Sequence, residues 1–210
     1  SSGLQAVAYG AQAIIAGHGD AVLAGGIEMM SQVPMSGYHT RLSPEITEHY
    51  IGMGFTAERV AQRWGITREM QDDFAFASQQ KAAAALANGV FAPEIVPITV
   101  RREQWSGAAR TVTEVVVDTD ECPRLDTTRE GLAKLRPAFS AKGSVTAGNA
   151  SPYSDGAAAV LVMRRDRADA LGLRPLARFV SFATAGVAPD IMGVGPIYAI
   201  PKALARAGLS

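Results

Sequence analysis

The sequence is short of cysteine, of net charge and of long apolar runs, and each shortage excludes a class of protein. Cys122 is the only cysteine in 210 residues, so no disulfide can form within the chain. Twenty basic and twenty acidic side chains balance, which leaves no overall field to attract nucleic acid or an anionic membrane. No apolar run approaches the roughly 20 residues of a membrane-spanning helix. We therefore predict no nucleic-acid partner, no membrane span and a bacterial-type cytoplasmic location, with an organelle matrix as the alternative.

Clusters of catalytic side chains are also scarce. The three histidines are scattered, and none has metal-ligand spacing with cysteine or a carboxylate, so we expect no metal site. His18 lies between two glycines in a turn, and His39 and His49 fall in a polar segment, so all three are interpreted as ordinary surface residues. Cys122 stands among four carboxylates, which disfavour its thiolate. We reject it as a nucleophile.

Both ends of the sequence have the pattern of a layered α/β domain. Apolar residues recur at intervals of three and four over residues 4–15, which predicts a helix. Residues 21–24 form a short apolar run that Gly25 and Gly26 should stop, as in a strand buried on both faces. Residues 155–163 predict a second buried strand of the same sheet. Because the glycines follow a helix and precede a strand, they do not form a dinucleotide-binding loop.

The composition changes between these strands, and we interpret residues 34–143 as an inserted subdomain of mixed α and β structure. Residues 56–64 predict a short helix, and Thr67 is the expected N-cap of a long helix that ends at Asn88. Residues rich in β-branched side chains predict two strands, at 94–100 and 111–117. The long helix should bury four residues: Ile66, Met70, Phe74 and Ala77. Beyond the insertion we expect a helix at 164–171, a strand at 178–183, and the end of a helix and a turn at 202–210.

Five segments form an ordered set along nearly the whole chain. They are Ser-Ser-Gly-Leu-Gln-Ala at 1–6, Gly-Gly-Ile-Glu-Met-Met-Ser at 25–31, Met-Gly-Phe-Thr-Ala-Glu at 53–58, Thr-Ala-Gly-Asn-Ala-Ser at 146–151 and Met-Gly-Val-Gly-Pro at 192–196. Together they resemble motifs of the thiolase family, in which the first segment directly follows the catalytic cysteine. The resemblance implies a thiolase-like layered αβαβα fold, incomplete here, with an inserted α+β loop domain.

The resemblance also divides the chain into domains. Residues 1–33 would be the rear of the N-terminal core domain, and residues 34–143 the loop domain, whose CoA-binding part extends to about 153. Residues 144–166 would return to the N-terminal core, and residues 167–210 would begin the C-terminal domain.

The chemistry that the resemblance implies is thiolysis. A cysteine attacks 3-ketoacyl-CoA, acetyl-CoA leaves, and CoA takes up the acyl group, so CoA is a substrate and no cofactor is needed. The family's nucleophile would stand directly before Ser1, where the amides of a helix N-terminus favour a thiolate. We therefore predict no catalytic residue within the 210 residues and expect this chain alone to be inactive.

Five substrate-binding residues carry over from the family by position. Ser151 would hydrogen-bond the pantetheine arm of CoA and Ala147 would line its tunnel. Met53 and Met192 would flank the acyl end, and Arg124 would contact the nucleotide end. Gly52 and Gly131 depart from residues that some family members carry, so the contacts would differ in detail.

Three functions remain open from the sequence. Ser-Asp-Gly-Ala at 154–157 and Ala-Ile-Pro-Lys-Ala-Leu at 199–204 resemble degradative 3-ketoacyl-CoA thiolases of fatty-acid β-oxidation. The alternatives are a biosynthetic acetoacetyl-CoA thiolase and a non-catalytic protein that binds CoA esters or lipids on the same fold. The resemblance implies a homodimer or homotetramer, alone or with a β-oxidation partner subunit.

Overall fold

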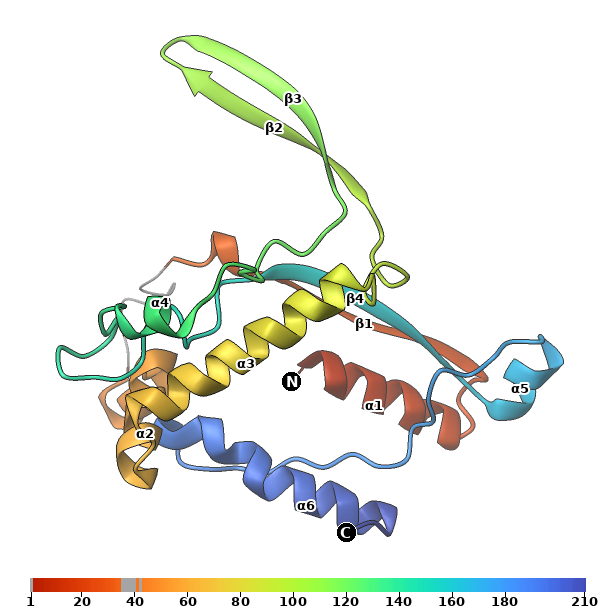
Figure 1. Cartoon of the computed structure of the whole chain (residues 1–210). Coiled ribbons are helices and arrows are strands. Elements are labelled where there is room, and N and C mark those ends of the chain that lie inside the picture. Colours follow the sequence, from red (N-terminus) through yellow and green to blue (C-terminus); the bar gives the residue numbers. More distant parts are fainter. Residues whose placement is uncertain (1, 35–40, 42) are drawn as a thin grey trace. The chain divides into compact units, whose positions relative to one another are not determined.

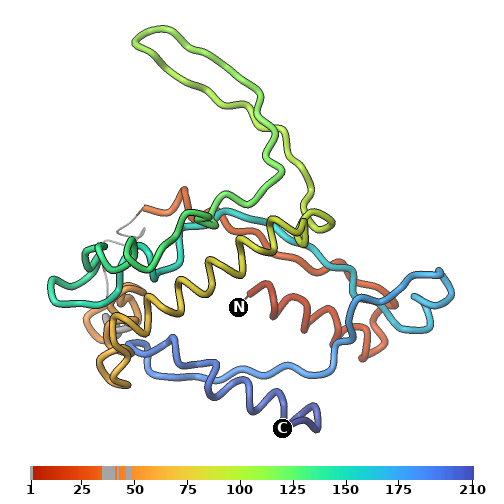
Figure 2. The backbone as a smooth tube through the Cα atoms, in the orientation of Figure 1, coloured from red at the N-terminus to blue at the C-terminus, as the bar shows by residue number. Residues whose placement is uncertain are grey.

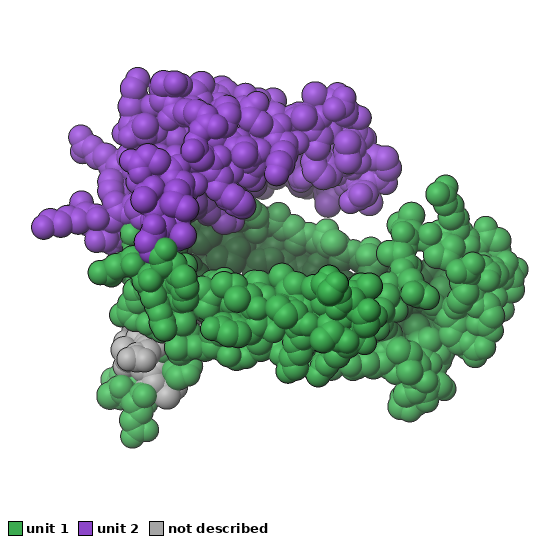
Figure 3. Space-filling model, turned by 60° about the horizontal axis from the view of Figure 1, so that its bottom comes forward, with its two compact units in different colours: residues 1–64, 153–210 green, residues 65–152 purple. Residues whose placement is uncertain are grey.

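A computed structural model describes residues 2–34, 41 and 43–210, which form two compact units. His39 lies outside the described residues. The first unit contains residues 1–64 and 153–210, and the second contains residues 65–152 (Figure 3). The assignment of these residues to family domains stays a prediction.

The elements follow in one order along the chain. They are α1 (Ser2–Ile15), β1 (Ala21–Met29), η1 (Met30–Gln32), η2 (Pro44–Tyr50), α2 (Met53–Trp64), α3 (Arg68–Ala87), β2 (Ile98–Ser106), β3 (Ala109–Val117), α4 (Arg129–Ala133), β4 (Asp155–Met163), α5 (Arg165–Ala170), η3 (Pro189–Val194) and α6 (Gly195–Ala207), where η marks a 3-10 helix. Among the described helices, none has both the length and the apolar character needed to cross a membrane.

In the first unit, helix α1 packs on the antiparallel pair of β1 and β4 (Figure 1). Small residues allow this close approach: Ala8 and Ala11 are buried, and a Cβ at Gly10 would lie 3.2 Å from Cγ1 of Val22. The predicted helix is confirmed, and so is the pairing of a second strand, β4, with β1. The predicted burial of β4 is wrong, since Val160 is 49% exposed and Leu161 is 57% exposed. The register runs from the Ala21–Met163 pair to the Met29–Asp155 pair.

Two predictions about β1 are wrong. The strand continues through both glycines to Met29, because Gly25 and Gly26 pair with residues of β4 and leave the ladder intact. It is not buried on both faces either: Ala24 is buried, whereas Leu23 is 73% exposed and Ile27 is 78% exposed. Within the first unit, helix α1 covers one face of the pair.

In the second unit, the capping prediction for α3 is confirmed. The Thr67 hydroxyl accepts a hydrogen bond from the Met70 amide, and the helix ends at the predicted Asn88.

The predicted buried stripe of α3 is wrong, since Met70 is 54% exposed and Phe74 is 79% exposed. Ala77 is exposed as well, and Ile66 is half-buried. The side of α3 that makes tertiary contacts carries polar residues instead, at positions 68, 71, 72 and 79.

The two predicted strands of the insertion form an antiparallel hairpin, β2–β3, which Figure 2 traces as one long excursion of the backbone. The first strand begins at Ile98 rather than at the predicted residue 94, because residues 88–94 form turns. Gly107 turns the chain with a φ of 59°, a left-handed conformation in which glycine avoids a Cβ clash.

The C-terminal part of the first unit differs from its prediction at one segment. Helix α5 and the end of α6 agree with the sequence, but residues 178–183 are not a strand. This segment has no strand partner in the described chain, and α6 binds it through polar bonds: Arg206 donates to the Phe182 carbonyl, and the Ser181 hydroxyl donates to the Ala203 carbonyl. The segment is therefore extended coil along a helix.

We predict that Gly25→Ala destabilises the chain by about 1–3 kcal/mol, the usual cost of overpacking. The new Cβ would lie 2.7 Å from the Ala158 carbonyl oxygen, so the backbone of β1 or β4 must move. Gly156→Ala in β4 is the matched control, because no atom lies within 4 Å of its Cβ position. Urea unfolding of both variants measures the difference, and equal stability would contradict the close approach at Gly25.

Candidate functional site

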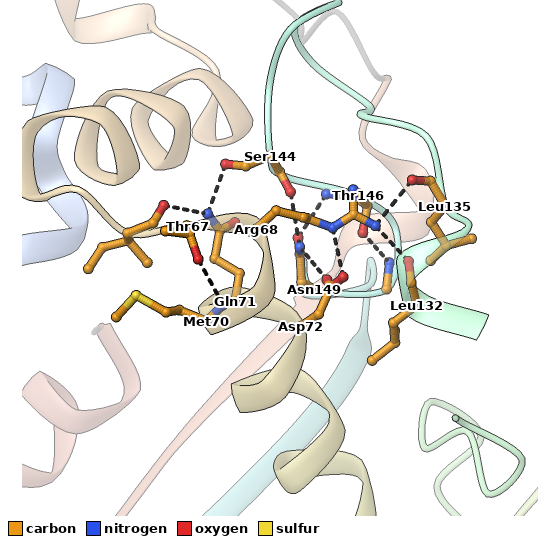
Figure 4. Close-up of polar contacts among 12 residues, drawn as sticks. Thr67, Arg68, Met70, Gln71, Asp72, Leu132, Leu135, Ser144, Thr146 and Asn149 are labelled. Atoms are coloured by element: carbon orange, nitrogen blue, oxygen red, sulfur yellow. Dashed lines mark hydrogen bonds and ion pairs between the residues drawn. The ribbon is translucent and has the colours of Figure 1, made fainter. Parts of the chain in front are cut away.

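A network of hydrogen bonds in the second unit is centred on Asp72 of α3 (Figure 4). Its Oδ2 accepts from Nε of Arg68, one helical turn earlier, at 2.8 Å. Its Oδ1 accepts from Nδ2 of Asn149 at 2.9 Å. Asp72 is buried, so its charge depends on these partners in place of water. One carboxylate thus connects a helix to residues 77 positions further along the chain.

The Asn149 side chain also forms hydrogen bonds with the backbone of its neighbours. Its Nδ2 also donates to the Ser144 carbonyl at 3.1 Å, and its Oδ1 accepts from the Thr146 amide at 2.8 Å. A flipped side-chain amide would set an oxygen against a carboxylate and an NH₂ group against an N–H, so only this orientation fits. The Asn149 side chain therefore ties residues 144–149 to α3. We call residues 144–151 the anchored loop.

Two further side chains of α3 bind the same region. Nε2 of Gln71 donates to the Ser144 hydroxyl at 2.8 Å. Nη2 of Arg68 donates to the Leu132 and Leu135 carbonyls, at 2.6 and 3.1 Å, so the same guanidinium holds the end of α4. The anchored loop also packs tightly against α4, because a Cβ at Gly148 would lie 2.5 Å from methyl carbons of Leu132 and Leu135.

Two of the predicted substrate-binding residues lie on the anchored loop. Thr146 is fully buried and Asn149 is half-buried, whereas Ala147 and Ser151 are exposed. The Ser151 hydroxyl donates to the neighbouring Pro152 carbonyl at 3.3 Å, a local contact that a ligand can replace. The loop is held from within and shows these two side chains to solvent. Their role in binding stays a prediction.

Arg124, the predicted nucleotide contact, lies in the segment between β3 and α4 of the same unit. Its side chain is exposed. Its backbone amide donates to Oε1 of Gln79 on α3 at 2.9 Å, and its carbonyl accepts from the Thr127 hydroxyl. Two hydrogen bonds therefore fix the backbone of Arg124, from which its exposed side chain extends. Its contact with CoA stays a prediction.

The other two predicted residues belong to the first unit. Met53 begins α2 and Met192 lies in η3, and these two elements pack together. Nη1 of Arg59 and Oδ2 of Asp190 form an ion pair across this contact at 3.2 Å. Both methionines are about half exposed, at 56% and 49%. The structure thus brings Met53 and Met192 onto one packed pair of short helices.

The first unit also joins Ser31, the last residue of the 25–31 motif, to Asp155 of the segment 154–157. The Ser31 amide and hydroxyl both donate to the Asp155 carboxylate, at 2.9 and 2.6 Å. These bonds lower the pKa of Asp155 below its ordinary value of 3.8, with the hydroxyl as the largest cause. They connect the segment after β1 to the first residue of β4. Nearby, the start of α1 approaches β1 so closely that a Cβ at Gly26 would lie 3.5 Å from the Gly3 Cα.

Sequence reasoning missed the residues that hold the anchored loop, above all Asp72 and Asn149. A usable signal was present, because polar residues recur along α3 at 68, 72 and 79 with helical spacing. The prediction placed an apolar stripe on the inner face instead.

The other candidate residues lie at the surface: His18, His49 and Cys122 are exposed. Within the described residues, no three His, Cys, Asp or Glu side chains gather as metal ligands would.

Comparisons with known proteins cover the whole chain. A family model described as "Thiolase, N-terminal domain" matches residues 1–166, and one described as "Thiolase, C-terminal domain" matches residues 173–210. The 3-ketoacyl-CoA thiolase of Bacillus subtilis (strain 168) is 51% identical over 224 residues, with 100% of this chain and 55% of the relative covered.

Two solved structures give the same result. The dimeric peroxisomal thiolase of Saccharomyces cerevisiae has a TM-score of 0.87 at 42% identity, covering 100% of this chain and 53% of that chain. An acetyl-CoA acetyltransferase of Bacillus anthracis has a TM-score of 0.84, also at 42% identity, covering 100% and 55%. The predicted fold class is confirmed by these scores. The chain spans about half the length of the proteins it matches.

We predict that Ser31→Ala lowers the free energy of unfolding in a pH-dependent way. The folded state holds the pKa of Asp155 below its unfolded value, so this stabilisation is present above the unfolded pKa and is lost as the pH falls through the folded pKa. The difference between wild type and Ser31→Ala should therefore be full at neutral pH and shrink below about pH 4. Denaturant unfolding across this range measures it.

The control for this prediction removes the titrating group. In an Asp155→Asn background, Ser31→Ala should have an effect that does not change with pH. A pH-independent difference in the wild-type background would show that the Ser31 hydroxyl does not act through the Asp155 charge.

Proposed function

Because the chain belongs to the thiolase family, we propose that the complete protein containing it is a degradative 3-ketoacyl-CoA thiolase. It cleaves 3-ketoacyl-CoA with CoA to give acetyl-CoA and a shortened acyl-CoA. The observation that carries this proposal is the anchored loop, which exposes Ala147 and Ser151 on a backbone fixed by Asp72 and Asn149. The family resemblance gives these two positions to the pantetheine arm of CoA.

In this proposal the reaction has two covalent steps. A cysteine thiolate directly before Ser1 attacks the ketone carbon, the bond between the second and third carbons breaks, and acetyl-CoA leaves after its carbanion takes a proton. The thiolate of a second CoA then attacks the acyl-enzyme thioester, and the cysteine thiolate leaves. Each step is easier than direct cleavage. The amides at the start of α1 favour the thiolate form of the nucleophile.

The remaining predicted residues divide the substrate between them. Arg124 offers a guanidinium to the phosphates at the nucleotide end of CoA, and its fixed backbone limits where that charge can reach. Met53 and Met192 provide adaptable apolar walls for the acyl chain, on helices that pack together in the first unit. We also propose that the complete protein is a homodimer, as the yeast peroxisomal thiolase is described to be.

A biosynthetic acetoacetyl-CoA thiolase is the second candidate. It is favoured by the likeness to the Bacillus anthracis acetyl-CoA acetyltransferase, which equals the yeast thiolase in sequence identity to this chain. The two candidates share the covalent steps and differ in the acyl chain that the site accepts. Substrate length therefore separates them.

We predict that the complete protein prefers long 3-ketoacyl-CoA esters to acetoacetyl-CoA by more than about tenfold in kcat/KM, because each buried methylene contributes about 0.8 kcal/mol. Measuring thiolysis along a series of chain lengths tests this. A preference for acetoacetyl-CoA would support the biosynthetic candidate. CoA-ester binding without turnover would support the non-catalytic alternative.

We predict that Arg124→Gln in the complete protein raises the KM for CoA by roughly three- to tenfold, because a charge-assisted contact with phosphate is lost. The KM for pantetheine as acyl acceptor should not change, because pantetheine lacks the nucleotide end. Steady-state kinetics with both acceptors make the comparison. Arg101→Gln, at an exposed position of β2, is the matched control, and an equal rise with both acceptors would exclude the proposed contact.

A further inference from the structure

We propose that Asp72 is a positioning residue for CoA: through Asn149 it sets the backbone of the anchored loop, and so the places of Ala147 and Ser151. The identity of the ligand rests on the proposed function. Asp72 lies beneath the loop and reaches its backbone only through another side chain.

The hydrogen bonds of Asn149 explain why the connection from Asp72 to the loop needs a carboxylate at position 72. Both protons of its Nδ2 are used, one by Asp72 and one by the Ser144 carbonyl, and its Oδ1 receives the Thr146 amide. A carboxylate at position 72 is therefore the acceptor that sets which way the Asn149 amide faces. An asparagine there, with its oxygen bound to Arg68, would turn an NH₂ group toward the NH₂ group of Asn149.

The loop depends on these bonds because it has no regular secondary structure. Its own contacts are short-range: the Gly148 amide donates to the Thr146 hydroxyl, and the Asn149 amide donates to the Thr146 carbonyl. These close the turn but do not attach it to α3. The attachment comes from the Asp72–Asn149 and Gln71–Ser144 bonds. Ala147 and Ser151 each lie two residues from Asn149, so its displacement moves both.

The test is Asp72→Asn in the complete protein. We expect the KM for CoA to rise roughly tenfold while kcat stays within about twofold, because binding geometry is lost and the chemical groups are untouched. Hydrogen exchange of the amides of residues 146–151 should accelerate by a similar factor, since these amides lose an ordered frame. The exchange measurement needs no CoA, so it reports on the loop by itself.

A reciprocal exchange of the two side chains separates positioning from general stability. Asn149→Asp alone sets two carboxylates against each other. Combining it with Asp72→Asn lets the new amide at position 72 donate to the new carboxylate at position 149, which can still accept from the Thr146 amide. We expect the double variant to recover the KM for CoA to within roughly threefold of wild type, a coupling that a double-mutant cycle measures. Recovery is partial because the Ser144 carbonyl loses its donor.

Two further variants keep the test decisive. Asn149→Ala leaves the Arg68–Asp72 pair intact and removes the route to the loop, together with the bonds of Asn149 to the Ser144 carbonyl and the Thr146 amide. It replaces Asp72→Asn if that variant fails to fold. Asp73→Asn is the matched control: it removes a neighbouring charge of α3 that pairs with Arg129 and makes no bond to the loop. It should leave both the KM for CoA and the loop exchange unchanged.

Each result has a defined meaning. Faster loop exchange with an unchanged KM for CoA, or unchanged exchange in folded Asp72→Asn and Asn149→Ala, overturns the positioning role. A wild-type protein with no saturable dependence on CoA overturns the proposed function instead, and the two failures are thereby distinguished.

Discussion

The carboxylate of Asp72 accepts from Arg68 with one oxygen and from Asn149 with the other, and the attachment of α4 and of the anchored loop to α3 depends on this division. Through Arg68 it reaches the end of α4, and through Asn149 it reaches the anchored loop. A buried carboxylate is tolerated only while both oxygens are bonded, since loss of a partner leaves a desolvated charge at a cost on the order of 1–3 kcal/mol. Order in the helix, in α4 and in the loop is therefore interdependent.

The first unit is held together by the packing of small residues and by polar bonds at the ends of its strands, rather than by a buried carboxylate. Its sheet is a single antiparallel pair in the described residues, and one face of that pair rests on α1 through alanine and glycine contacts. The Ser31–Asp155 bonds close one end of the pair, and the bond of the Arg164 amide to the Asp20 carbonyl closes the other. Packing of small residues fixes the distance between helix and sheet, and polar bonds at both ends fix the register.

The sequence predicts the helices and the cap of α3 well, but it predicts tertiary burial, the end of β1 and the conformation of residues 178–183 poorly. Thr67 caps α3 as expected because an N-cap depends on residues three positions away, and the family motifs predict the fold class. The predicted burial of β1, Met70 and Phe74 was wrong, because the burial of a strand or helix face depends on which other elements pack against it. The anchoring of residues 144–151 was missed for a similar reason: the Asp72–Asn149 bond spans 77 positions, and no local pattern connects them. The five substrate-binding residues are predicted from the family resemblance, which indicates their positions but not the hydrogen bonds that hold the backbone at those positions.

Helix α3 also sets the distance between two of its attachments. Asp72 holds the anchored loop, and Gln79 holds the backbone of Arg124. Seven residues separate the two, close to two full turns, so both side chains leave the same face about 10 Å apart along the axis. Removing or inserting one residue between them would turn one attachment by about 100° relative to the other. A substitution leaves this spacing unchanged, whereas an insertion or deletion displaces one attachment from the other, so length changes are better tolerated in the turns at either end of α3.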